Sequence, residues 1–142
     1  VIASFVFGMG SKVKSAPQAQ FMLEDASDQV DSNVNDLFVV TDFGGEPVKC
    51  SEIQLQVINT TNARIYTLTW HEDTNTFNAT DPYDEHLNTT PISDGVLNVG
   101  DTFTVREGSG HGDAFAQPTT VEFRIIHTPT GTIIYDGRVT IQ

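Results

Sequence analysis

The chain has little of three things that define many functional classes: cysteine, positive charge and long apolar segments. Its 142 residues include one cysteine, Cys50, which excludes an internal disulfide and a metal site built from several cysteines. Lysine and arginine number 7 against 19 aspartates and glutamates, which gives a net charge of −12. So acidic a chain offers no basic patch to phosphates, and we expect no nucleic-acid partner. The acidity is typical of an exposed surface that stays soluble through self-repulsion.

Motifs of catalysis and cofactor binding are also missing. The sequence contains no nucleophile elbow, no nucleotide-phosphate loop and no dinucleotide fingerprint. The glycine-rich stretch 108–113 lies between two expected strands and opens no helix, so we interpret it as a hairpin connection. Cys50 would need a neighbouring histidine to act as a nucleophile, and its place before an alternating strand favours a small core or edge residue. We therefore expect neither an enzyme nor a bound cofactor.

Histidines beside acidic residues leave metal binding open as a weak alternative. His71, His86 and His111 could supply imidazole ligands, but their spacing matches no metal-binding pattern. Solvated loop positions explain them more simply. The acidic stretch 25–31 lacks the glycine and the terminal glutamate of a calcium-binding loop. We expect no metal site.

The most apolar segment is short and stands at the first residue. Residues 1–10 contain one polar side chain, Ser4. A helix that is apolar all round is buried in a bundle or in lipid, yet ten residues cover only about 15 Å, roughly half of a bilayer core. Lys12 and Lys14 follow as a water-facing helix end, and Pro17 closes the element. We interpret residues 1–16 as the second half of a longer apolar assembly helix; an ordinary N-terminal core helix is the alternative.

After Pro17 the apolar residues follow a two-residue period. Ile53, Leu55 and Val57 share one face of a predicted strand, and Tyr66, Leu68 and Trp70 share one face of the next. Runs rich in β-branched and aromatic residues alternate with turns rich in glycine, asparagine and proline. The pattern predicts a mainly β fold, in which residues 17–142 form an antiparallel, immunoglobulin-like β-sandwich of about seven strands. The predicted strands include 36–43, 52–57, 65–70, 102–105, 121–125 and 131–141.

Three N-x-[ST] triplets occur within a short part of the chain. They begin at Asn59, Asn78 and Asn88, and none has proline in its middle position. Such triplets accept N-linked glycans in exported proteins. We expect a glycosylated surface at these asparagines; plain Asn/Thr-rich loops are the alternative.

The N-terminal stretch VIASFVFGMGSKVKSAPQAQF resembles the second half of the N-terminal segment of archaeal type IV pilins. The likeness extends to the segments 37–57, 97–105 and 121–141, and it is looser through 60–95. At the N-terminus the matching residues are Phe5, Phe7, Gly8, Gly10, Ser15, Ala16, Pro17, Gln18, Ala19 and Phe21.

The resemblance implies the structural subunit of an adhesion pilus. Subunits of that family lose a class III signal peptide and wait in the membrane, anchored by the apolar helix. They then pack these helices into the core of an extracellular homopolymer that attaches to host or abiotic surfaces. The first half of the helix and the cleavage site are not in the sequence given. The expected subunit-contact residues are Val1, Ile2, Phe5, Val6, Phe7 and Met9, with Gly8 and Gly10 allowing close helix approach.

Two other functions stay open on the sequence. An archaellum subunit would use a similar helix in a rotating filament. A membrane-tethered β-sandwich would instead bind a ligand or carbohydrate, and the loop aromatics Tyr83 and Phe115 beside acidic residues are candidates for such binding. Only the tethered module would tolerate a charge at Phe5 or Val6, because it needs no helix packing.

Overall fold

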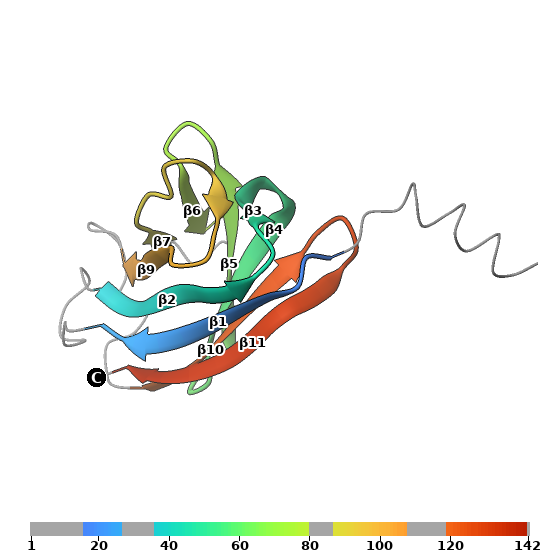
Figure 1. Ribbon diagram of the computed structural model, residues 1–142. Helices are drawn as coiled ribbons and strands as arrows, with labels where there is room; N and C mark the ends of the chain where they lie inside the picture. Colours follow the sequence, from blue (N-terminus) through green and yellow to red (C-terminus); the bar gives the residue numbers. More distant parts are fainter. Residues whose placement is uncertain (1–15, 27–35, 80–86, 108–118, 142) are drawn as a thin grey trace, which may run out of the picture.

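The computed structural model describes residues 16–26, 36–79, 87–107 and 119–141 (Figure 1). Within these ranges the chain forms strands joined by turns and one short 3-10 helix, η1 (Cys50–Glu52), and no α-helix. The strands are β1 (Ala19–Asp25), β2 (Asp36–Gly45), β3 (Val48–Lys49), β4 (Ile53–Asn59), β5 (Arg64–His71), β6 (Thr76–Ala79), β7 (Leu87–Thr89), β8 (Val96–Leu97), β9 (Thr102–Glu107), β10 (Thr119–His127) and β11 (Thr132–Ile141).

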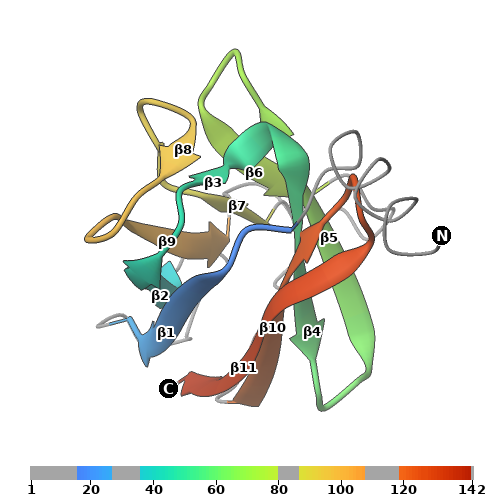
Figure 2. The same cartoon turned by 45° about the vertical axis from the view of Figure 1, so that its right-hand side comes forward.

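Nine of the strands form one antiparallel sheet in the order β1-β2-β9-β7-β6-β5-β4-β10-β11. The sheet curls until its two edge strands, β1 and β11, lie side by side, so that it makes a nearly closed barrel (Figures 1 and 2). The rings of Phe21 on β1 and Tyr135 on β11 meet across this seam with their centroids 5.7 Å apart. Side chains of β1 and β11 thus cover the seam, so that the two edge strands face each other rather than open solvent.

The mainly β, antiparallel fold class is confirmed, and every long strand expected from the two-residue period is present. The arrangement differs from a sandwich of about seven strands because β6 and β7 bridge β5 to β9 and join what would be two sheets into one. These two strands are only 4 and 3 residues long, too short to show a period in the sequence. The expected helix at residues 1–16 falls almost entirely outside the described residues.

Aromatic rings fill the interior of the barrel. The alternation predicted for β4 is confirmed, since Ile53, Leu55 and Val57 are all buried. A continuous aromatic row runs through the core from β5 to the seam between β1 and β11, with neighbouring ring centroids 5.1–6.5 Å apart. The row consists of Trp70, Phe77, Phe103, Phe123, Tyr135 and Phe21.

Phe123 is the central member of this row. It is fully buried on β10 and contacts Phe38 on β2 as well as Phe103 on β9, with centroid distances of 5.4 and 6.5 Å. Neither β2 nor β9 is a neighbour of β10 in the sheet, so these contacts cross the interior. Phe123 thereby holds opposite walls of the barrel together.

A small cap closes one end of the barrel. Strands β3 and β8 pair only with each other among the described strands, through Val48–Leu97 and Lys49–Val96. Val48, Leu97 and Cys50 are fully buried beneath this cap. The cap therefore completes the core at the end where β5 finishes and β4 begins (Figure 2).

Truncating the central ring tests this description of the core. Phe123→Ala removes contacts to three rings at once and should lower the free energy of unfolding by about 3–5 kcal/mol. Urea titration followed by circular dichroism measures the loss. Phe43→Ala removes the same ring from a position that is 51% exposed and should change stability by no more than about 0.5 kcal/mol. Equal losses in the two variants would contradict the assigned core.

Candidate functional site

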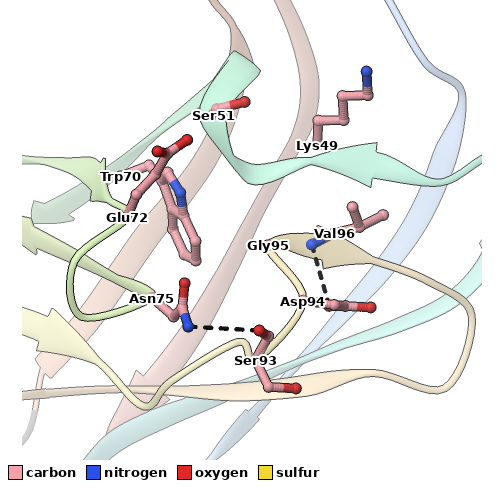
Figure 3. Close-up of a pocket in the computed structure, with 9 residues that line it drawn as sticks. All are labelled: Lys49, Ser51, Trp70, Glu72, Asn75, Ser93, Asp94, Gly95 and Val96. Atoms are coloured by element: carbon pink, nitrogen blue, oxygen red, sulfur yellow. Dashed lines mark hydrogen bonds between the residues drawn. The ribbon is translucent and has the colours of Figure 1, made fainter.

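A polar groove lies between the cap and the turn that joins β5 to β6. Its main hollow has a volume of about 420 Å³, within the range typical of small-ligand sites. Figure 3 shows the walls: Lys49 and Ser51 come from β3 and η1, Trp70, Glu72 and Asn75 from the β5–β6 hairpin, and Ser93, Asp94, Gly95 and Val96 from the segment leading into β8. Three segments distant in the sequence therefore build one site.

Trp70 forms the apolar wall of the groove. It continues the inward face of β5 after Tyr66 and Leu68, as the two-residue period predicts, but at the strand's end, where its ring is only partly covered. The edge of Phe77 meets the indole at a centroid distance of 5.1 Å and an interplanar angle of 61°. Opposite, Gly95 approaches so closely that an added Cβ would lie 3.5 Å from the indole Cζ2. The ring is thus held between the core and the loop.

The polar walls are held by local hydrogen bonds. Asp94 Oδ1 accepts a bond from the Val96 backbone N–H at 3.2 Å, and Asn75 Nδ2 donates to the Ser93 carbonyl at 3.5 Å (Figure 3). Asn75 itself adopts a positive φ of 55°, a conformation that asparagine tolerates better than most residues. The side chains of Glu72, Asp94 and Ser51 are exposed. The groove therefore offers carboxylate, amide and hydroxyl groups to solvent, and those of Asp94 and Asn75 are held by hydrogen bonds to the backbone.

A second hollow of about 330 Å³ adjoins the first. It shares Ser51, Trp70 and Glu72 with the first hollow and adds Ile53 and Gln54 from β4, Thr69 from β5 and Thr128, which follows β10. Trp70 therefore contributes to both hollows.

The three predicted glycan-acceptor asparagines lie in different surroundings. Asn59 ends β4 and is 5% exposed, and its Oδ1 accepts a bond from the Thr61 N–H at 2.9 Å. Asn78 and Asn88 are partly exposed and face each other across the β6–β7 ladder. Asn88 Oδ1 accepts a bond from Arg106 Nε at 3.0 Å, whereas Asn78 Oδ1 accepts one from the Thr76 hydroxyl at 3.3 Å.

The expected subunit-contact residues, from Val1 to Gly10, lie outside the described residues. In the described ranges no helix has the length and apolarity that would take it across a membrane. His86, His111, Tyr83 and Phe115 also fall outside those ranges. His71 is described, and among the described residues no three His, Cys, Asp or Glu side chains gather as metal ligands.

Neither a scan against models of protein families nor a search of curated protein sequences found a match to the chain.

The sequence did not reveal the groove. The two-residue period places Trp70 on one face with Tyr66 and Leu68, but its role as a wall depends on Gly95 and Asp94, which only the fold brings near it. A sole tryptophan at the end of a strand, followed after His71 by two acidic residues, is the signal that could have indicated it.

The buried thiol near this groove gives a chemical test of the cap. Burial, reinforced by the charges of Asp94 and Asp101, raises the pKa of Cys50 to about 12. A raised thiol pKa means less thiolate at a given pH, so at about pH 8 only about one molecule in ten thousand is ionised. Folded protein should react negligibly with Ellman's reagent and fully once unfolded in guanidinium chloride. Rapid reaction of the folded protein would show that the cap does not cover Cys50.

Proposed function

We propose that this chain is the structural subunit of an archaeal type IV adhesion pilus. The observation that carries the proposal is the resemblance of residues 5–21 to the helix end and the Ser-Ala-Pro-Gln-Ala junction of that family. In this proposal residues 1–16 polymerise in the filament core. Residues 17–142 form the displayed domain, whose two facing walls correspond to an immunoglobulin-like sandwich.

Contacts within and between the segments 37–57, 97–105 and 121–141, to which the resemblance extends, support the proposal. The end of β2 and the turn before β9 are hydrogen-bonded through the backbone: Asp42 N–H to the Asp101 carbonyl at 2.9 Å, and Gly100 N–H to the Asp42 carbonyl at 2.7 Å. The third segment forms the β10–β11 hairpin, as expected for a closing hairpin. The family-like motifs are therefore structural parts of the barrel.

The junction between the two parts is tied down. The Glu46 N–H donates to the Gln18 carbonyl at 2.7 Å, and the Gln18 N–H donates to Glu46 Oε1 at 3.1 Å. Gly45 has a φ of 95°, and a Cβ there would collide with the Gln18 backbone. The Gly-Gly-Glu turn thus fixes the backbone at Gln18, at the start of the domain. A pilus subunit needs such a fixed junction, because force passes through it between the helix and the domain.

The assembly mechanism follows from hydrophobic burial. The helix leaves lipid for a bundle of identical helices, and each buried Val, Ile or Phe contributes about 1.5–3 kcal/mol relative to exposure in water. Because the contact between successive subunits is head-to-tail and does not close into a ring, its repetition produces a helical fibre outside the cell. The net charge of −12 limits lateral sticking between displayed domains.

A charge placed on the assembly helix tests polymerisation. Phe5→Glu would bury an unpaired carboxylate in the helix bundle, so the yield of filaments should fall by more than about tenfold. Electron microscopy of sheared cells counts the filaments. Val99→Glu adds the same charge to a side chain of the domain that is 60% exposed and should leave the yield unchanged. A full yield from Phe5→Glu would contradict the pilin proposal and favour the tethered binding module.

We further propose that N-linked glycans decorate the displayed domain, with Asn78 as the preferred acceptor. Asn59 is buried and bonded to its own turn, and Asn88 accepts a charge-assisted hydrogen bond from the Arg106 guanidinium at 3.0 Å, whereas Asn78 accepts only a longer bond from the Thr76 hydroxyl at 3.3 Å. Opposed residues on neighbouring strands have Cβ atoms only about 4.5–5.5 Å apart, which leaves no room for glycans on both Asn78 and Asn88.

Mass spectrometry of peptides from the exported protein checks this ranking. Most molecules should carry a glycan at Asn78, and no single molecule should carry glycans at both Asn78 and Asn88. Asn78→Gln should shift occupancy to Asn88, because the opposing glycan is removed. Simultaneous occupancy, or a glycan mainly at Asn59, would contradict the geometry.

A further inference from the structure

We propose that the groove beside Trp70 binds a neutral oligosaccharide. The inference deepens the adhesion function proposed above and rests on it for where the groove is displayed. The binding chemistry itself depends only on the described residues around Trp70.

The indole gives the groove one flat apolar wall. Phe77 contacts the ring from the core side and Gly95 lies near its Cζ2 atom, so these contacts restrict the ring and reduce the entropy lost when a ligand packs on it. The C–H face of a pyranose is flat and weakly positive, and it packs on the electron-rich face of an aromatic ring. A rigid tryptophan in a polar groove is suited to such a ring.

The surrounding groups suit hydroxyl ligands. Glu72 and Asp94 are exposed carboxylates that can accept charge-assisted hydrogen bonds from sugar hydroxyls. Asn75 and Ser51 can both donate and accept. Several short, mixed polar groups around one aromatic wall match a polyhydroxylated ring better than an apolar molecule.

Charge selects against acidic ligands. The groove carries two carboxylates against one lysine, and the Lys49 side chain points away from the Trp70 ring (Figure 3). The whole chain adds a net charge of −12. Sialylated, sulfated and phosphorylated ligands are therefore repelled, and neutral sugars are favoured.

The shape of the groove favours more than one sugar unit. The hollows of about 420 and 330 Å³ adjoin each other, since Ser51, Trp70 and Glu72 line both. A quaternary ammonium would instead need several rings around it, and among the described residues that line the two hollows Trp70 is the one aromatic side chain. We therefore place a disaccharide or longer chain across the indole.

Trp70 reports on its own occupancy, because it is the only tryptophan in the chain. The full 142-residue chain, dispersed in a non-glycosidic detergent, is titrated with chitobiose, mannobiose, cellobiose and lactose while its emission is recorded. At least one should shift the emission to the blue and reduce quenching by acrylamide. Sialyllactose and choline serve as the acidic and cationic probes and should do neither. The chain is also tested for binding to a wider array of neutral glycans. The proposal would be overturned if no neutral sugar bound in either experiment, or if only choline or sialyllactose changed the emission.

Matched variants locate the site. Glu72→Gln and Asp94→Asn keep the shape of each side chain and remove its charge, and each should weaken binding by about tenfold. Both residues are exposed, so folding should persist. Glu24→Gln removes a charge from the outer face of β1 and should bind as wild type. Trp70→Ala should abolish binding on the array, and Trp70→Phe should restore part of it. Unchanged affinity in Glu72→Gln and Asp94→Asn would contradict the assigned site.

The same variants separate this inference from the proposed pilus. Trp70→Phe and Asp94→Asn should assemble filaments in normal number, and wild-type filaments should bind the sugar that the dispersed chain binds. Filaments without sugar binding would refute the groove and leave the subunit role intact. Sugar binding by a chain that forms no filaments would refute the subunit role instead. Binding by the dispersed chain but not by filaments would contradict the link between groove and adhesion.

Discussion

The contact of Phe123 with rings on the opposite wall is the interaction on which the rest of the structure depends. A nearly closed sheet has an interior that side chains must fill, and here the rings of Phe38 and Phe103 reach Phe123 across it. The row then passes through Phe77 to Trp70 at the end of β5. The packing of the core therefore sets the position of the groove, because Trp70, which lines the groove, is the last ring of the row that fills the barrel.

The same end of the barrel combines a closed core with a polar surface. The β3–β8 cap shields Val48, Leu97 and Cys50 from water. Ser51, just after β3, and Asp94, just before β8, are exposed at the surface of the same end. The turn at Gly45, at the end of β2, is hydrogen-bonded to the chain at Gln18, just before β1 begins. In the proposed pilus, a rigid junction, a solid acidic domain and a groove of polar groups would be repeated once per subunit along the fibre. Many weak sugar contacts in such an array would add by avidity.

Sequence periodicity was sufficient for the long strands and insufficient for what joins them. Ile53, Leu55 and Val57 alternate with glutamines, so the burial of β4 could be predicted residue by residue. The short strands β6 and β7 hold too few residues for a period, and their pairing decides that the fold is one curled sheet. The groove could not be predicted, because Ser51, Trp70 and Asp94 come together only through long-range pairing. The opposition of Asn78 and Asn88 likewise depends on strand register, which a list of sequons does not contain.

The measurement that tests the central claim most directly is a helical reconstruction, by electron cryomicroscopy, of filaments from cells that express this chain. The account predicts a core of packed apolar helices that includes residues 1–16, with the barrel of β1–β11 outside it and the Trp70 groove open to solvent. Filaments in which this chain is absent, or a chain that is recovered only as separate molecules in the membrane fraction, would contradict the account.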